Sequence, residues 1–142
     1  MPFTGKSIST LLVISTISFT FLGCATTKPG PYVPASGATS KEDVYAAVLL
    51  DEGLQKWIAV DRIKTEHLED RRLKVHANIR NMQGQAITVQ AQTIYKDNDG
   101  FSIGDDTAWQ TLIFSPNETK TYESVSMKTS AVRYTIRIRY GQ

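Results

Sequence analysis

Apolar and polar residues alternate with a period of two over much of the second half of the chain. The alternation is clearest at residues 72–80, 87–96 and 132–140, where one set is Leu, Val, Ile, Ala or Tyr and the other is mostly Arg, Lys, Gln or Thr. Successive side chains of a strand point to opposite faces, so these stretches predict strands with one buried face. The connection at residues 81–85 contains Asn and Gly and predicts a hairpin between the first two strands.

Weaker alternation predicts further strands at residues 57–64, 109–114 and 119–127. In the last of these the apolar spacing shifts by one position, which predicts a β-bulge. Turn residues separate the strands at 97–100 and 115–118. Residues 40–50 fit either a helix that begins at Ser40 or a first strand at residues 46–51, and we favour the strand.

The pattern as a whole predicts an all-β domain over residues 41–142. Roughly six or seven strands with no long amphipathic helix between them argue against a parallel β-α-β architecture. We therefore expect an immunoglobulin-like antiparallel β-sandwich that lacks the usual disulfide. A small barrel is the alternative.

The start of the chain has a different pattern, an apolar run at residues 11–22 that follows Lys6 and ends at Gly23 and Cys24. A helix over this run is about 18 Å long and too short for a hydrocarbon core of about 30 Å, whereas a signal peptide has such a segment. The arrangement resembles a bacterial prolipoprotein, in which Leu22 and Gly23 belong to the lipobox. The resemblance implies that residues 1–23 are cleaved and that Cys24 carries diacylglyceryl and palmitate chains.

Acylation of Cys24 predicts a stable membrane anchor, because two or more chains hold a protein where one does not. Ala25 follows the cysteine, and by analogy with lipoprotein sorting this favours the periplasmic face of the outer membrane. Residues 24–40 are rich in Pro, Gly, Ser and Thr and predict a flexible tether to the folded domain.

Composition excludes several classes of function. The net charge of +2 is too small for a protein whose partner is nucleic acid. The chain has one cysteine, so acylation of Cys24 leaves no thiol for a disulfide, a redox centre or a thiolate metal site.

Searches for catalytic and metal-binding motifs give no candidate. In the acidic stretch at residues 97–106, counting from Asp97 places Gly100 fourth and Ala108 twelfth, whereas an EF-hand loop needs Gly sixth and Glu twelfth. His76 falls on the polar side of a predicted strand and has no cysteine partner. No nucleophile elbow, phosphate-binding glycine loop or zinc-protease helix is present. We expect no enzyme activity, no metal and no cofactor.

The last predicted strand carries a candidate binding face formed by Arg133, Arg137 and Arg139, which share one side of the strand. These arginines would bind an anionic partner such as a lipid phosphate, an acidic glycan or an acidic protein. If residues 72–80 belong to the same sheet, their cations would make the face more basic. The alternative is that cross-strand pairs with acidic residues give an ordinary surface, and that alternative is the one we favour.

Several short segments carry a family resemblance over roughly residues 48–140. They are residues 48–51, Asn81, residues 95–101, Trp109 with Leu112, Pro116 and Glu118, and residues 137–140. In their order and spacing the chain resembles the YcfL-like periplasmic lipoproteins of bacteria. The resemblance implies a lipid-anchored β-sandwich with no agreed activity. It also implies a genomic association with lipoproteins that activate peptidoglycan synthesis.

Two functions fit these expectations. The first is a non-enzymatic outer-membrane lipoprotein that serves as a structural or protein-binding module of an envelope assembly, such as cell-wall synthesis, secretion or flagellar outer-ring machinery. The second is a periplasmic binding protein for anionic glycan or lipid, which would use the face of Arg133, Arg137 and Arg139. A hydrolase would require a deep pocket with a perturbed acid or base.

Overall fold

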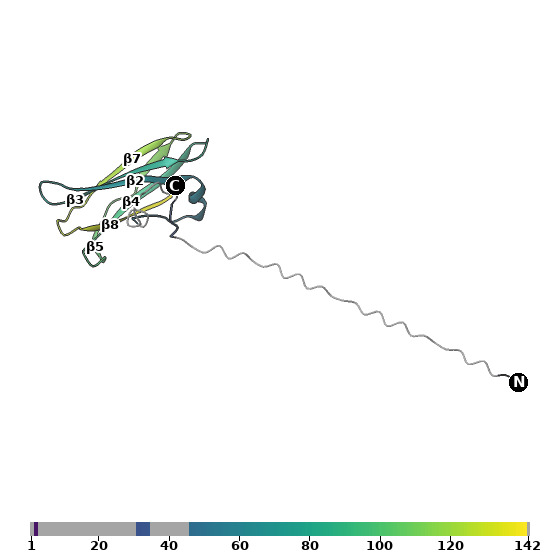
Figure 1. Ribbon diagram of the computed structural model, residues 1–142, viewed down its shortest axis with the longest axis horizontal. Helices are drawn as coiled ribbons and strands as arrows, with labels where there is room; N and C mark the ends of the chain where they lie inside the picture. Colours follow the sequence, from purple (N-terminus) through teal and green to yellow (C-terminus); the bar gives the residue numbers. More distant parts are fainter. Residues whose placement is uncertain (1, 3–30, 35–45, 142) are drawn as a thin grey trace.

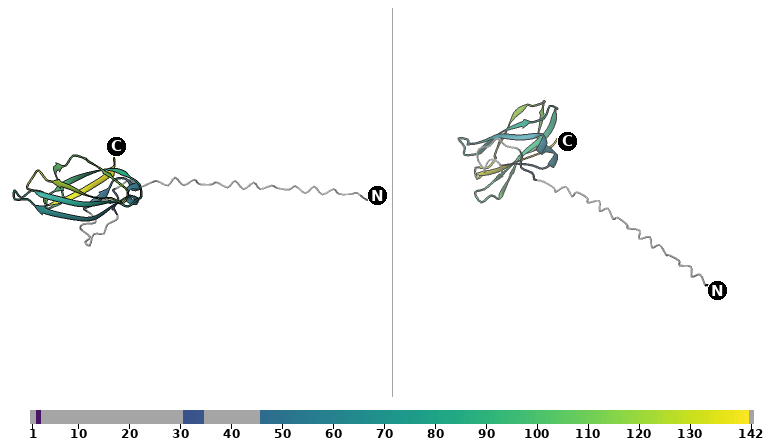
Figure 2. Two further views of the ribbon diagram at one scale, coloured as in Figure 1. Left: turned by 90° about the horizontal axis from the view of Figure 1, so that it is seen from above. Right: turned by 45° about the vertical axis from the view of Figure 1, so that its right-hand side comes forward.

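Eight strands in the described part of the chain form two sheets that face each other (Figures 1 and 2). The computed structural model describes residues 2, 31–34 and 46–141. Its elements are β1 (Ala47–Leu49), the 3-10 helix η1 (Glu52–Lys56), β2 (Ile58–His67), β3 (Leu73–Asn81), β4 (Ile87–Lys96), β5 (Ser102–Asp106), β6 (Gln110–Phe114), β7 (Thr119–Val125) and β8 (Arg133–Tyr140). The predicted all-β sandwich is confirmed, and the chain forms two sheets instead of one closed barrel.

The sheet that we name sheet A contains β1, β8 and β4 in that order, with β5 and β6 both paired to the remaining edge of β4. Sheet B contains β2, β3 and β7. In Figure 1 the strands of sheet B lie above β8 and β5 of sheet A. All pairings are antiparallel except that of β1 with β8, which is parallel.

The predicted hairpin between residues 72–80 and 87–96 is wrong. β3 pairs with β2 and β7, and β4 pairs with β5, β6 and β8, so residues 82–86 carry the chain from sheet B to sheet A. The buried side chain of Asn81 holds this crossover. Its Nδ2 donates to the carbonyl oxygens of Gln85 (2.6 Å) and Ser115 (3.0 Å), and its Oδ1 accepts from the amide of Gln83 (3.0 Å).

The bulge predicted in residues 119–127 is also wrong. β7 pairs with β3 in unbroken register from Thr119 to Val125. Register shifts lie instead in β2, between Val60 and Arg62, and in the pairing of β4 with β5, between Ile94 and Lys96. Alternation continues through β7 because Ser124, like Tyr122, is a buried residue. β5, which the sequence pattern did not predict, occupies part of the acidic stretch at residues 97–106. The strand alternative for residues 46–51 is confirmed by β1, whereas residues 40–45 lie outside the described part.

A buried cluster of hydroxyl groups joins the two sheets inside the apolar core. Thr93 Oγ1 lies 3.0 Å from the hydroxyl oxygen of Tyr122 and 2.8 Å from Ser124 Oγ, and the Tyr95 hydroxyl donates to Ser124 Oγ at 2.9 Å. Each hydroxyl has a partner, which offsets the cost of removing it from water. Burial raises the pKa of Tyr95 to about 12.

The described residues 31–34 lie against the edge of β1. Tyr32 and Leu49 exchange two backbone hydrogen bonds of 2.6 Å, and Tyr32 packs against the core. These residues belong to the segment predicted as a tether, whose other residues, with Cys24 and the predicted signal peptide, lie outside the described part apart from Pro2. None of the helices among the described residues has the length and apolar character needed to span a membrane.

Candidate anionic-partner face

The outer face of sheet A carries four cations, Arg133, Arg137 and Arg139 on β8 and Lys96 on β4. Cross-strand pairing places Lys96 beside Arg133, and Gln92 and Gln90 of β4 are opposite Arg137 and Arg139. The alternate residues Ile136 and Ile138 are fully buried, so the arginines point away from the core. Arg137 and Arg139 are about 7 Å apart along the strand, and Arg133 is about 13 Å from Arg137. We call these four residues the basic face.

Neutral side chains are the partners of Arg139 and Lys96 in the basic face. Arg139 donates from Nε to Gln90 Oε1 (3.0 Å), and its guanidinium carbon is 4.0 Å from the ring centre of Trp109. Lys96 Nζ donates to Thr135 Oγ1 at 2.9 Å. Among the described residues, no carboxylate lies within 4.0 Å of a charged nitrogen of the basic face. Cross-strand neutralisation, which the sequence analysis favoured, therefore does not occur between the described residues.

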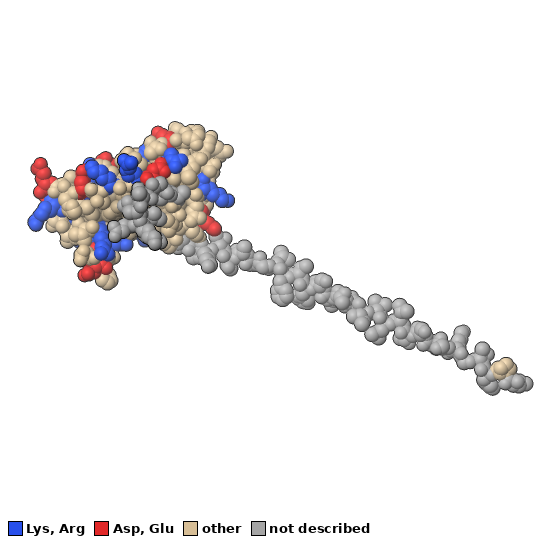
Figure 3. Space-filling view, in the orientation of Figure 1, with Lys and Arg blue, Asp and Glu red and all other residues tan. Residues whose placement is uncertain are grey.

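The cations of residues 72–80 do not extend the basic face, because they belong to sheet B or its border. Lys74 Nζ lies 3.3 Å from Glu123 Oε2, and Arg80 makes two hydrogen bonds of 2.7 and 2.9 Å to the carboxylate of Asp61. Arg72, just before β3, donates from Nε to Asp70 at 2.6 Å. Figure 3 shows basic and acidic side chains next to one another along the upper side of the molecule, where sheet B lies.

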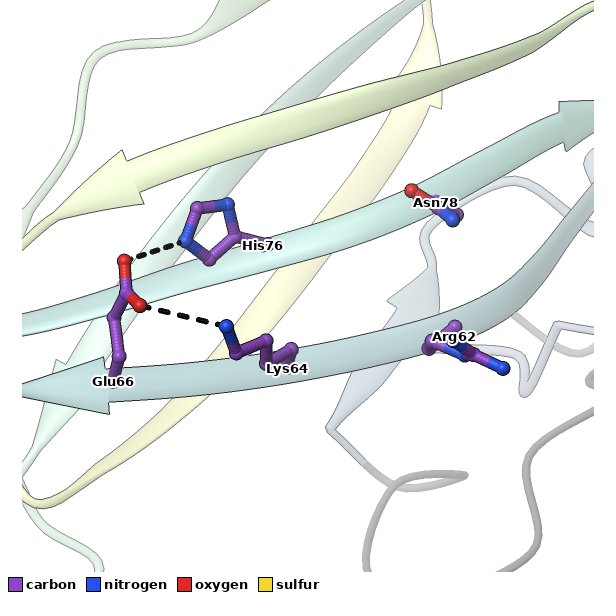
Figure 4. Close-up of a pocket in the computed structure, with 5 residues that line it drawn as sticks. All are labelled: Arg62, Lys64, Glu66, His76 and Asn78. Carbon is purple, nitrogen blue, oxygen red and sulfur yellow. Dashed lines mark hydrogen bonds and ion pairs between the residues drawn. The ribbon is translucent and has the colours of Figure 1, made fainter.

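The outer face of sheet B also contains a shallow depression of about 300 Å³ (Figure 4). Its lining residues are Arg62, Lys64, Glu66, His76 and Asn78. His76 lies between two carboxylates, with Nε2 at 3.0 Å from Glu66 and Nδ1 at 2.9 Å from Glu123. Both ring nitrogens of His76 are therefore within hydrogen-bonding distance of a carboxylate.

The carboxylates around His76 are stabilised in their charged form. The hydrogen bond from His76 lowers the pKa of Glu66, and hydrogen bonds from Lys74 and then His76 lower the pKa of Glu123. Hydrogen bonding to Arg80 likewise lowers the pKa of Asp61. Hydrogen bonds and ion pairs between these charged side chains connect the three strands of sheet B, so the charged groups have a structural role.

The acidic stretch at residues 97–106 is also used for structure. Asp97 Oδ1 accepts from the amides of Asp99 and Phe101 at 3.0 and 2.9 Å, which closes the turn before β5. Asp105 is buried and its Oδ2 accepts from the amides of Met127 (2.7 Å) and Lys128 (3.0 Å). Within residues 31–34 and 46–141, no group of three or more His, Cys, Asp or Glu side chains is arranged to hold a metal ion.

Sequence reasoning identified the arginines of the basic face but missed Lys96 and Trp109. Lys96 could have been found, because alternation along residues 87–96 puts it on the polar side of a strand. No sequence signal could show that this strand pairs with β8, or that Trp109 lies under Arg139, because both depend on long-range pairing.

Comparison with known proteins gives a family and two solved structures. Over 68% of its length the chain is similar to cj0090 of Campylobacter jejuni, with 17% identity, a TM-score of 0.54 and 99% of that chain covered. A DUF1425 family member from Shewanella sp. pv-4 matches 60% of the chain with 19% identity, a TM-score of 0.54 and 79% of that chain covered. At these identities the likeness shows the fold alone. No curated protein matches the chain. Residues 46–140 match the model of DUF1425, described as a protein of unknown function, and the chain therefore belongs to the DUF1425 family.

Proposed function

We propose that this protein is a non-enzymatic module of the bacterial envelope, anchored by acyl chains on Cys24 at the periplasmic face of the outer membrane, which binds an anionic partner. The proposed anchor rests on the apolar run that ends at Leu22, Gly23 and Cys24. We also propose that the chain is one of the YcfL-like lipoproteins, which it resembles and whose lipid anchor fits this arrangement.

The observation that carries the proposal is the difference in charge pairing between the two sheets. On sheet B, Lys64, Lys74 and Arg80 each lie within 4.0 Å of a carboxylate, and Arg62 is the exception. On sheet A, none of the four cations has a carboxylate partner among the described residues. Cations gathered on one face without internal partners attract an external anion.

The first candidate partner is an acidic surface of a protein in an envelope assembly. Cell-wall synthesis, secretion and flagellar outer-ring machinery are the assemblies that suit a lipid-anchored sandwich. The anchor would hold the domain close to a membrane-embedded assembly and so raise its effective concentration there.

The second candidate partner is an anionic glycan or lipid. The polar groups beside the arginines favour it, because the amides of Gln90 and Gln92 lie opposite Arg139 and Arg137 in the register of β4 and β8. Amides next to guanidinium groups can bond phosphate or carboxylate oxygens together with neighbouring hydroxyl groups. Such binding would weaken as ionic strength rises, because Arg133 is exposed and the other three cations are partly exposed to solvent.

The experiment that tests the proposal is purification of the acylated protein from its native envelope after mild cross-linking, followed by identification of what accompanies it. We expect a stoichiometric partner that is lost from the Arg133→Ser/Arg137→Ser/Arg139→Ser variant. The matched control removes three positive charges elsewhere, with Arg62→Ser, Lys64→Ser and Arg71→Asn, and should keep the partner. Mass spectrometry of the amino terminus tests the anchor separately: an unmodified Cys24 in an uncleaved chain would contradict it.

A further inference from the structure

We infer that the basic face lies on the anionic phospholipid headgroups of the same bilayer that anchors the chain. The inference rests on the proposed acylation of Cys24 and names the partner of the face described above. It follows from where the amino-terminal segment joins the domain, from the direction of β8, and from the side chains that surround the arginines.

The amino-terminal segment joins the domain on sheet A. Tyr32 and Leu49 exchange two backbone hydrogen bonds, and Gln55 Nε2 donates to the carbonyl oxygen of Val33 at 3.5 Å. Tyr32 is the eighth residue after Cys24, so the chain between them can reach at most about 26–29 Å. The edge of β1 is therefore held within that distance of the acylated residue.

The basic face is next to this junction. β1 pairs directly with β8, with Val48 opposite Arg137 and Leu49 opposite Ile138. Arg137 and Arg139 are thus on the strand adjacent to the one that holds Tyr32, near the end of the sandwich where the chain enters. Arg133 and Lys96 lie farther along the same face, so the four cations follow the sheet for about 20 Å away from the anchored end.

The surroundings of the arginines suit a membrane surface. The face is the outside of a sheet, and the depression lined by Glu66 and His76 is on the opposite sheet. Trp109 is partly buried under Arg139, and Ile113 is 63% exposed at the position opposite Thr88 on β4. Tryptophan and exposed aliphatic side chains enter the interfacial region of a bilayer, while arginines bind its phosphates.

Docking in this way would turn sheet B away from the bilayer, because the two sheets form opposite faces of the sandwich. The compensated surface of sheet B would then face the periplasm.

The test uses the acylated full chain in vesicles of neutral phosphatidylcholine, compared with vesicles that also contain about 30 mol % phosphatidylglycerol. A water-soluble amine-reactive reagent modifies exposed lysines, and mass spectrometry follows each site. We expect Lys96 to react about threefold or more slowly on the anionic vesicles, and this protection to disappear in about 1 M salt. Lys64, on the outer face of sheet B, is the internal control and should react equally on both.

A second readout uses Trp109, which is the only tryptophan left in a Trp57→Phe variant. Lipids brominated near the headgroup should quench its fluorescence more strongly in anionic vesicles than in neutral ones. Lys96→Ser, Arg133→Ser and Arg137→Ser together should remove that difference and leave the contact of Arg139 with Trp109 in place. The matched control Arg62→Ser/Lys64→Ser/Arg71→Asn removes the same charge elsewhere, and Asn tolerates the positive φ of Arg71.

Equal modification of Lys96 and equal quenching of Trp109 on the two kinds of vesicle would overturn the inference. So would protection of Lys96 that requires an added acidic glycan or a cross-linked protein in place of anionic lipid. Failure of Cys24 acylation would instead overturn the proposed function, and mass spectrometry of the amino terminus of the same sample distinguishes the two.

Discussion

The outer faces of the two sheets both carry cations but differ in how these charges are balanced. On sheet B, His76 joins Glu66 and Glu123 across three strands, and Arg80 forms a bidentate pair with Asp61. On sheet A, Arg139 contacts the amide of Gln90 and the ring of Trp109, and Lys96 contacts the hydroxyl of Thr135. The comparison indicates that the charges of sheet B are satisfied within the domain, whereas those of sheet A are left for a partner.

The largest effect should come from breaking the crossover that separates the two faces. Asn81→Ala removes three hydrogen bonds and leaves the carbonyl groups of Gln85 and Ser115 without this donor. We expect the free energy of unfolding, measured by urea denaturation, to fall by about 2–4 kcal/mol. Asn78→Ala, on the outer side of the same strand, is the control and should cost less than about 1 kcal/mol. Equal losses would show that Asn81 has no special role.

The hydroxyl cluster that joins the sheets should give the next largest effect. Tyr95→Phe removes the hydrogen bond to Ser124 Oγ, and we expect a loss of about 1–2 kcal/mol in urea denaturation. Because Ser124 keeps its contact with Thr93 Oγ1, the loss should stay below that of Asn81→Ala. A neutral result would mean that the buried hydroxyl of Tyr95 contributes nothing to the packing of the sheets.

Tyr95 should also make the free energy of unfolding decrease at alkaline pH. Its pKa is raised from 10.0 to about 12 in the folded protein, so the native state keeps this proton where the unfolded chain loses it. The contribution of the Tyr95 hydroxyl to the free energy of unfolding should be complete below pH 10 and should be lost as the pH rises toward 12. Urea midpoints measured across this range should fall less in Tyr95→Phe than in the unmodified protein, and parallel curves would contradict the assignment.

Acid should weaken sheet B selectively. The pKa values of Glu66 and Glu123 are lowered in the folded state, so their contribution is present above the usual value of 4.5 and is lost as the pH falls through the lowered values. We expect the urea midpoint of Glu66→Gln/Glu123→Gln to change less between about pH 5 and about pH 3 than that of the unmodified protein. Arg137→Ser, on sheet A, should leave the pH profile unchanged.

The smallest effects on stability should come from single arginines, and they compare the charges of the two sheets directly. Arg80→Ala breaks the bidentate pair with Asp61 and should cost about 0.5–1 kcal/mol, because both side chains are partly exposed. Arg137→Ala should change the free energy of unfolding by less than about 0.5 kcal/mol, because no carboxylate partner is lost. A larger cost for Arg137→Ala than for Arg80→Ala would show that the basic face serves stability.

The sequence predicts the strands well where alternation is regular. It predicts them less well where a polar residue occupies a position on the buried face of a strand. Ser124 and Ser126 follow Tyr122 at buried positions of β7 and its end, and their hydroxyl groups are paired. A pattern that counts only apolar residues counts these serines as outward, which is why it predicted a bulge. Asp105 is a similar case, because its burial depends on two amides more than twenty residues away.

The candidate face was predicted in part. Alternation alone puts Arg133, Arg137 and Arg139 on one side of a strand, because the period of a strand is two. Whether they meet acidic residues depends on which strands are neighbours. Glu123, for example, belongs to β7 of sheet B, where it binds Lys74 and His76.

By itself, then, the amino-acid sequence determined the all-β class, most strand positions and the side of β8 on which the arginines lie, because these properties depend on local periodicity. The tertiary structure decided which strands are neighbours. A polar residue at position 81 followed by a short connection suits either a hairpin or a crossover between sheets, and only the hydrogen bonds of Asn81 to Gln85 and Ser115 select the crossover. That selection separates the balanced charges of sheet B from the basic face of sheet A.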